Sequence, residues 1–285
     1  MSRRRKKEDL DVKDDLDVEV GREIHLVEPA HSGTEAAVIP VFEELPVFEE
    51  EDLDSSPTNP VAEMALDESS APGEQFRLLG ARVRALARDR RLRRVGVVSA
   101  AQGEGKTTVS LGLARSLAVD GHSRVLLVEF DLRRPAIDRS MGLPPPEIGL
   151  RQYLEGEAGT TVTLRRPETA GFWILSAGEG TLTRPEVLTS PRMVSLLKAA
   201  ERVFDYTVID CPPLLPVADA VVFQDHIDGF VLVVRARHSP RETVQRAADL
   251  LKPERICGVV MNDQADILPS YREYANRRYG ERPPR

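Results

Sequence analysis

A glycine-rich turn carrying a lysine is the part of the sequence best suited to binding phosphate. It lies between an apolar run at residues 94–100 and a helical pattern at 109–117. In that setting the backbone N–H groups of the turn and of the helix N-terminus point at phosphate oxygens. Lys106 is expected to reach the β- and γ-phosphates of a nucleotide, and the Thr107 hydroxyl to bind Mg²⁺. The residues predicted to form this loop are Gln102, Gly103, Glu104, Gly105, Lys106, Thr107 and Thr108.

Three carboxylates follow apolar runs at the points where a nucleotide site needs them. Asp210 ends the run at 206–209, and Glu129 and Asp131 follow the run at 125–128. The i, i+2 spacing puts Glu129 and Asp131 on one side of an extended segment, and open α/β sheets bind ligands at the carboxyl ends of their strands. The alternative for a single carboxylate in such a place is a helix cap or a solvated charge. Because three occur beside a phosphate loop, we predict that they line the site.

Apolar runs of strand length alternate along the chain with segments of helical period. The runs are continuously apolar, as expected for strands covered by helices on both faces. Strands separated by helices predict a three-layer α/β domain with a mainly parallel sheet, which we place at residues 72–265. The expected strands are residues 94–100, 125–128, 172–175, 206–209, 230–234 and 256–261. The expected helices are residues 76–88, 109–117, 190–203, 218–224 and 240–251.

Residues 1–71 differ sharply in composition from the rest of the chain. The first 70 residues carry 7 Lys/Arg and 20 Asp/Glu, whereas the remainder carries 32 and 26. With few aromatic residues and no sustained period, this segment is predicted to be a disordered acidic arm. Its one local feature is a short repeat, residues 41–46 followed by 47–50, whose acidic and apolar residues could dock on a basic groove. The simpler interpretation is a solubilising tail.

Several classes of protein are excluded by what the 285 residues lack. No window reaches the roughly 18 apolar residues of a membrane-spanning helix, and the basic N-terminus is not followed by the apolar stretch of a secretory signal. Two cysteines, Cys211 and Cys257, allow neither a disulfide scaffold nor a zinc ribbon. The modest basic excess after residue 70 has no interleaved aromatic residues, which argues against nucleic-acid binding. We therefore expect a cytoplasmic protein.

Three motifs together resemble the cytoplasmic bacterial tyrosine kinases (BY-kinases) that partner polysaccharide co-polymerases, over about residues 74–262. The first is a phosphate loop of the Gly-Glu-Gly-Lys-Ser/Thr type at residues 103–107. The second, three aliphatic residues before Asp-x-Asp-x-Arg, corresponds to residues 126–133, with Glu129 at the first acidic position. The third is the Walker B segment at 204–213. Family-like stretches at 184–188, 228–235 and 258–262 continue the match.

The resemblance implies a P-loop NTPase fold, an ATP-dependent protein-tyrosine (auto)kinase, and ATP and Mg²⁺ as cofactors. Residues 102–108 would hold the ATP phosphates, and Asp210 would support the metal, directly or through water. Asp131, with Glu129, would orient metal-bound water and steer the phenolic proton. Arg133 would stabilise phosphate charge or contact a neighbouring subunit, unless it is a solvated surface residue. The implied catalytic residues are Lys106, Glu129, Asp131, Asp210 and Arg133, and the implied metal ligands are Thr107, Asp131 and Asp210.

The expected phosphate acceptors lie near the C-terminal end. Of the 5 tyrosines, Tyr271, Tyr274 and Tyr279 fall within residues 266–285, which we predict to form a flexible tail. Arginines in this tail would be drawn to an acidic cleft that carries phosphate. The alternative is that these tyrosines pack a short terminal helix.

The resemblance also implies a role in capsular or exopolysaccharide synthesis and export. The expected partner is the cytoplasmic tail of a membrane co-polymerase (chain-length determinant), which would recruit this chain to the inner face of the membrane. A homo-oligomer is a further expectation: the family's first helix often carries Glu-x-x-Arg-x-x-Arg for ring assembly, and this chain has Glu74 and Arg77 but Gly80 at the third position. The alternative function is an ATP-binding regulatory switch, docked on the co-polymerase, with little or no kinase activity. The tyrosine tail favours the kinase, whereas Glu129 and Gly80 favour the switch.

Overall fold

The computed structural model describes residues 47–53, 60–119, 122–159, 161–180, 182, 185–215, 221 and 223–263. The tail predicted at residues 266–285 lies outside this part of the chain, as do residues 1–46 of the predicted arm. The proposed boundaries and character of these two end segments therefore stay predictions.

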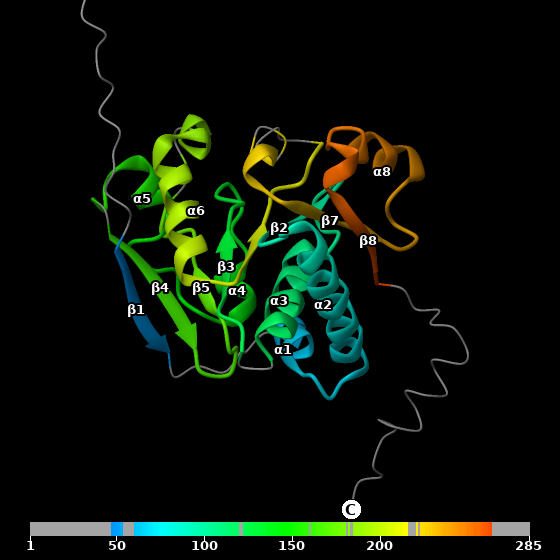
Figure 1. Cartoon of the computed structure of the whole chain (residues 1–285), viewed down its shortest axis with the longest axis horizontal. Helices are drawn as coiled ribbons and strands as arrows, with labels where there is room; N and C mark the ends of the chain where they lie inside the picture. Colours follow the sequence, from blue (N-terminus) through cyan, green and yellow to red (C-terminus); the bar gives the residue numbers. More distant parts are fainter. Residues whose placement is uncertain are drawn as a thin grey trace, which may run out of the picture. The chain divides into compact units, whose positions relative to one another are not determined.

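The described residues form an eight-stranded sheet in the order β1-β4-β5-β3-β6-β2-β7-β8 (Figure 1). Neighbouring strands run parallel, except that β4 and β5 pair antiparallel. The mainly parallel sheet is confirmed, and each of the predicted strands is present; β1 and β4 are additional. The strands are β1 (Val47–Leu53), β2 (Arg94–Ser99), β3 (Val125–Glu129), β4 (Thr161–Pro167), β5 (Trp173–Leu175), β6 (Tyr206–Asp210), β7 (Gly229–Arg235) and β8 (Ile256–Asn262).

Helices pack on both faces of the sheet, which gives the three layers that the sequence predicted. One apolar core includes residues of α1 (Pro60–Leu66), α2 (Ala71–Arg90), α3 (Lys106–Ala118) and α4 (Ile137–Met141). The other includes residues of α5 (Leu150–Glu155), α6 (Pro191–Val203) and α8 (Arg241–Ala248). Short 3-10 turns lie at Pro185–Thr189, Gln224–His226 and Pro253–Arg255. The helix predicted at 218–224 falls largely outside the described residues.

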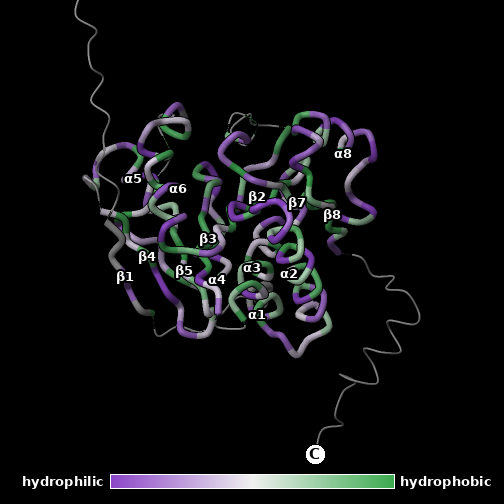
Figure 2. Tube along the Cα trace, viewed as in Figure 1, coloured by the Kyte–Doolittle hydropathy of each residue, from purple (hydrophilic) through white to green (hydrophobic). Residues whose placement is uncertain are grey.

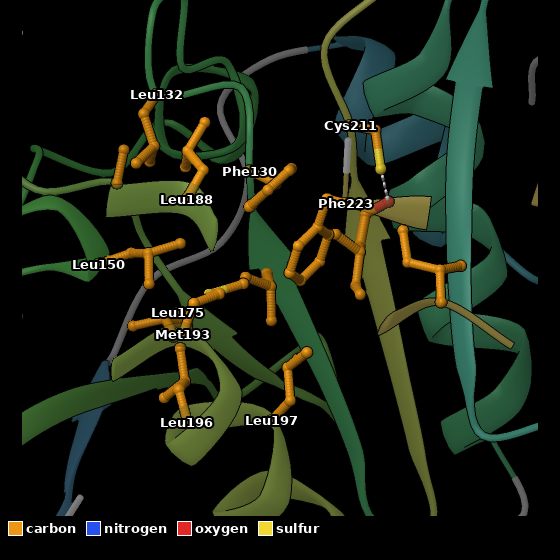
Figure 3. Close-up of a cluster of buried hydrophobic side chains, with 14 of the residues drawn as sticks. Phe130, Leu132, Leu150, Leu175, Leu188, Met193, Leu196, Leu197, Cys211 and Phe223 are labelled. Atoms are coloured by element: carbon orange, nitrogen blue, oxygen red, sulfur yellow. Dashed lines mark hydrogen bonds between the residues drawn. The ribbon is translucent and has the colours of Figure 1, made fainter. Parts of the chain in front are cut away.

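Alternate side chains of the central strands enter the two cores. Along β2, Val97 packs in the core of α1 to α4, and Val98 packs in the core of α5, α6 and α8. This alternation follows from the two-residue period of a strand, and it explains why the runs are apolar throughout. In the second core Phe130 packs on Phe223, with ring centroids 4.6 Å apart (Figure 3). Figure 2 shows the hydrophobic residues concentrated along the central strands.

Two segments of the predicted disordered arm belong to the folded domain. β1 pairs in parallel with β4, and Glu51 of β1 lies 3.8 Å from the guanidinium of Arg165. Helix α1 packs on α3 and buries Ala65. The prediction of disorder up to residue 71 is therefore wrong for residues 47–53 and 60–66. The sequence analysis missed them because β1 depends on its pairing with β4 and α1 packs on α3, and no local pattern contains these contacts.

None of the helices in the described part of the chain is both long enough and apolar enough to cross a membrane.

Candidate nucleotide-binding site

The predicted phosphate loop connects the end of β2 to the beginning of α3. Gly103 and Gly105 have positive φ angles of 79° and 94°, a region that glycine adopts freely and other residues rarely adopt. Gly105 directly precedes α3, whose first N–H groups have no partner within the helix. Lys106 begins that helix with 7% of its surface exposed. The loop therefore supplies the N–H donors and the cation that phosphate binding requires.

Asp210 meets the first turns of α3 because β6 and β2 are neighbours in the sheet. Thr107 Oγ1 donates a hydrogen bond to Asp210 Oδ2 at 2.7 Å, and Ser110 Oγ donates to Asp210 Oδ1 at 3.0 Å. Asp210 itself is 1% exposed. A hydroxyl and a carboxylate in contact beside a phosphate loop are the protein ligands that Mg²⁺ takes in such sites.

The donor set fits magnesium bound together with a nucleotide. No group of three or more His, Cys, Asp or Glu within the described ranges could hold a metal ion by itself. Mg²⁺ does not need such a group, because one or two carboxylates together with substrate phosphates and waters complete its octahedral shell. Thr107 and Asp210, next to Lys106 and the N-terminus of α3, satisfy that requirement.

Glu129 lies at the end of β3, directly across from Asp210 in the pairing of β3 with β6. Its Oε2 accepts hydrogen bonds from the backbone N–H groups of Ala136 at 2.7 Å and Ile137 at 2.8 Å. Its Oε1 accepts from the N–H of Asp131 at 3.3 Å. Because Ile137 begins α4, this buried carboxylate caps the helix, which is the alternative that the sequence left open for a carboxylate after a strand.

Burial dominates the protonation of the two buried carboxyls. Burial raises the pKa of Asp210 to about 6, although the hydrogen bond from Thr107 and the charge of Lys106 act in the opposite direction. Burial also raises the pKa of Glu129 well above its ordinary value, and the neighbouring charge of Asp210 adds to the effect. Asp131 raises the pKa of both groups. The structure therefore brings the predicted carboxylates into one electrostatic cluster.

The segment that follows β3 contacts the phosphate loop. Asp131 is half-buried, and its Oδ1 accepts a hydrogen bond from the backbone N–H of Arg134 at 3.1 Å. The guanidinium of Arg134 donates to the side-chain oxygen of Gln102 in the loop. Arg133, which the motif singled out, is exposed. A contact between the two segments is thus made by Arg134, which the sequence analysis did not include among the site residues.

Glu104 contributes its side chain to the interior of the protein. It is 1% exposed, and its Oε2 accepts from the N–H of Ala101 at 2.9 Å while its Oε1 accepts from the Ser239 hydroxyl. The side-chain amide of Asn262 donates to the Glu104 carbonyl at 2.9 Å. Because both carboxylate oxygens and the carbonyl of Glu104 already accept hydrogen bonds, its backbone N–H is the group that can bind phosphate. Thr108 lies half-buried in the first turn of α3.

Besides Arg134, three residues contact the site that the sequence analysis did not place there. Ser110 follows Thr107 by one helical turn, so helical spacing could have identified it. Ser239 follows β7, and Asn262 ends β8 within the family-like stretch at 258–262; no local pattern at either residue indicates contact with the loop. The predicted acceptors Tyr271, Tyr274 and Tyr279 lie outside the described residues.

Two curated relatives match the part of the chain that contains this site. Succinoglycan biosynthesis transport protein ExoP of Rhizobium meliloti (strain 1021) is 34% identical over 176 residues, which make up 59% of this chain and 22% of ExoP. Tyrosine-protein kinase YwqD of Bacillus subtilis (strain 168) is 29% identical over 207 residues, which make up 72% of this chain and 86% of YwqD. The chain thus spans less than a quarter of ExoP but most of YwqD. No family model matches the chain.

A solved structure also matches this chain. The crystal structure of the VpsO kinase domain is 31% identical in sequence, with a TM-score of 0.57. The match covers 68% of this chain and 100% of that chain. The similarity therefore extends over the whole length of that domain.

Proposed function

We propose a protein-tyrosine kinase activity for this chain, which belongs to the bacterial tyrosine kinase family. The proposed reaction transfers the γ-phosphoryl group of ATP to a tyrosine hydroxyl, and the acceptors are Tyr271, Tyr274 and Tyr279 of its own tail. The observation that carries this proposal is the contact between Thr107 and Asp210, at 2.7 Å, directly beside Lys106 and the start of α3. The names of YwqD and of the VpsO kinase domain support it.

In this proposal the protein positions charged groups more than it forms covalent bonds. Bound ATP supplies the phosphoryl group, and Mg²⁺ neutralises its charge. Lys106 and the backbone N–H groups of residues 102–108 hold the phosphates. Thr107, Asp131 and Asp210 are the residues that would hold the metal. A cation at this position favours the charged form of Asp210 and so opposes the rise in its pKa that burial causes.

Asp131 is the carboxylate that we assign to the phenolic proton of the acceptor. Glu129 is committed to the N–H groups of Ala136 and Ile137, so its proposed part in catalysis is to hold the segment that carries Asp131. Asp131 is half-buried and follows two residues later. Arg133, which is exposed, is proposed to stabilise phosphate charge or to contact a neighbouring subunit.

The proposed biological role is regulation of capsular or exopolysaccharide synthesis and export. It is supported by the name of ExoP, a succinoglycan biosynthesis transport protein. The proposed partner is the cytoplasmic tail of a membrane polysaccharide co-polymerase, which would bring this chain to the inner face of the membrane. Homo-oligomerisation is proposed as part of that assembly.

The kinase activity is tested by measuring ADP release and phosphotyrosine separately. The wild type is compared with Lys106→Met and with the triple variant Tyr271→Phe, Tyr274→Phe, Tyr279→Phe. We expect Lys106→Met to lose both signals, because the phosphates lose their cation. We expect the triple variant to lose phosphotyrosine, as read by mass spectrometry of the tail.

Two outcomes would contradict the kinase. If the wild type releases ADP while its tail stays wholly unmodified, the result would favour the ATP-binding switch instead. ADP release and phosphotyrosine that both persist in Lys106→Met would remove the proposed nucleotide site altogether.

A further inference from the structure

On the side away from Asp210, residues that end or follow β7 and β8 form hydrogen bonds to the phosphate loop. Asn262 is the last residue of β8, and its Nδ2 donates to the Glu104 carbonyl at 2.9 Å. Ser239, which follows β7, donates its hydroxyl to Glu104 Oε1. The other carboxylate oxygen, Oε2, accepts from the N–H of Ala101 at 2.9 Å. Glu104 therefore links the beginning of the loop to β7 and β8.

The approach of Asn262 depends on the glycine next to Glu104. A Cβ at Gly105 would lie 1.9 Å from Asn262 Nδ2, far inside any real contact. Gly105 also has a φ of 94°, which side-chain-bearing residues rarely adopt. The glycine that directly precedes α3 thus leaves room for an amide that holds the loop, and this explains its place in the loop beyond its conformational freedom.

The two strand ends that carry Ser239 and Asn262 are themselves joined. The N–H of Ala236 donates to the Asn262 carbonyl at 2.8 Å. Arg235, the last residue of β7, forms an ion pair with Asp263 at 2.9 Å, and its guanidinium also lies 3.5 Å from the Gly103 carbonyl. Because β2 lies between β6 and β7 in the sheet, the loop is held by Asp210 on one side and by this group on the other.

We propose that Asn262 and Ser239 are positioning residues of the phosphate loop, which hold it in its phosphate-binding shape through Glu104. This inference rests on the proposed function, because it concerns the same loop. In the sequence, Asn262 lies nine residues before Tyr271, the first of the predicted acceptor tyrosines. We refer to Asn262, Ser239 and Glu104 together as the clamp.

A loop that leaves this shape for part of the time binds its ligand more weakly in proportion to that time. Asn262→Asp replaces the N–H donor with a carboxylate oxygen that faces the Glu104 carbonyl. We expect this variant to bind Mg·ADP about tenfold more weakly. Ser239→Ala should weaken binding in the same direction by about fivefold, as for a lost hydrogen bond, and Ser239→Thr, which keeps the hydroxyl, should restore it.

The test uses two probes, Mg·ADP and Mg·tripolyphosphate, measured by calorimetry on the full chain. Tripolyphosphate carries phosphates but no base or ribose, so it reports on the loop alone. A clamp that acts through the loop weakens both ligands by the same factor. The control is Val259→Thr, an exposed position of β8 that is 56% accessible, which should leave both affinities unchanged. Thermal unfolding of each variant checks that it is folded.

The outcomes are distinguishable from failure of the proposed function. If Asn262→Asp weakens Mg·ADP but not Mg·tripolyphosphate, Asn262 contacts the nucleoside and the clamp is overturned. Unchanged binding in both Asn262→Asp and Ser239→Ala also overturns it. If the wild type binds neither ligand, the nucleotide site itself is wrong. A kinetic readout separates positioning from chemistry: KM for ATP should rise, while the rate at saturating ATP stays close to that of the wild type.

Discussion

At the scale of single residues, the cluster of carboxylates divides into groups with different tasks. Asp210 contacts hydroxyl groups of α3, whereas Glu129 contacts backbone N–H groups at the start of α4. Glu129 thus makes a structural contact, although it lies close to the proposed metal site. This division could not be predicted from spacing, because both residues simply follow apolar runs.

The capping task of Glu129 leads to a prediction about stability. Glu129→Ala leaves the N–H groups of Ala136 and Ile137 buried without an acceptor, which should cost about 1–3 kcal/mol of unfolding free energy. Glu129→Gln keeps a carbonyl oxygen that can accept from both, so we expect a much smaller loss. Chemical denaturation of the two variants measures the difference. Equal losses in Ala and Gln would show that the negative charge, and not the acceptor, matters.

The half-buried carboxyl of Asp138, in α4, gives a prediction about pH. Its Oδ1 accepts from Ser176 Oγ at 2.6 Å and from Arg165 at 3.1 Å. Burial nevertheless raises the pKa of Asp138, against the opposing effects of Ser176 and Arg165. The native state therefore binds this proton more tightly than the unfolded chain does, whose Asp pKa is about 3.9. Asp138 contributes its full stabilisation below that pKa, and the contribution is lost as pH rises through the higher pKa of the folded state.

The pH effect is isolated by subtracting a variant that cannot titrate. We expect the unfolding free energy of wild type minus that of Asp138→Asn to fall as pH rises above about 4 and then to level off. Denaturant unfolding at a series of pH values measures this difference. A difference that grows with pH would mean that the ion pair with Arg165 outweighs burial.

At the scale of elements, the acidic strand β1 covers an edge that is otherwise open to association. β4 carries Arg165 and Arg166, and β1 brings Glu50 and Glu51 to that side of the sheet. Glu50 lies 3.6 Å from Arg124, and Glu51 lies 3.8 Å from Arg165. Charged residues on an edge strand also discourage pairing with other chains.

Removing β1 should therefore promote association. Deletion of residues 1–53 turns β4 into the edge strand, and we expect concentration-dependent self-association in sedimentation experiments. Loss of the ion pairs alone contributes only about 0–1 kcal/mol each, so unfolding should be a secondary effect. Deletion of residues 1–46, which keeps β1, is the matched control. Association of equal strength in both deletions would mean that β1 does not protect the edge.

Helix α2 shows why the ring-assembly motif is incomplete at its third position. Glu74 and Arg77 pair with each other at 2.5 Å within the helix. Gly80 instead faces α3, where a Cβ would lie 2.1 Å from the Ser116 hydroxyl. An arginine at position 80 cannot fit there without moving α3. The departure from the family pattern is thus a consequence of close packing between two helices.

The elements that could be predicted are those whose signal is local. The central strands carry continuous apolar runs because both of their faces are buried, and these runs predicted them correctly. β4 could not be recognised in the same way because Arg165 and Arg166 interrupt its apolar pattern. Helices α4 and α5 are too short to show a helical period. β1 depends on its pairing with β4, which no local window contains.

At the scale of the whole molecule, the order of the strands explains how far the site could be predicted. Lys106, Thr107 and Asp210 could be assigned because a phosphate loop and a carboxylate after a strand are local patterns. Ser239 and Asn262 could not, because their contacts with the loop depend on β7 lying next to β2 and on β8 lying next to β7. The site is therefore formed by the ends of five adjacent strands, β3, β6, β2, β7 and β8, together with the phosphate loop.

If the loop and strands bind as a unit, a bound nucleotide must stabilise the whole domain. Mg·ADP at about 100 times its dissociation constant should add roughly 2.7 kcal/mol to the free energy of unfolding. For a domain of this size that corresponds to a rise in Tm of about 5–10 °C. Differential scanning fluorimetry measures the shift.

EDTA and the Lys106→Met variant separate the contributions of the metal and of the phosphate loop to this stabilisation. EDTA should remove most of the shift in Tm, because it removes the metal ion proposed to bind at Thr107 and Asp210. Only Lys106 and the N-terminus of α3 then neutralise the charge of the phosphates. Lys106→Met should show little shift with or without magnesium. A full shift that survives EDTA would mean that Thr107 and Asp210 hold each other and not a metal. Stabilisation would then come from the loop alone, and the Thr107–Asp210 contact would be structural.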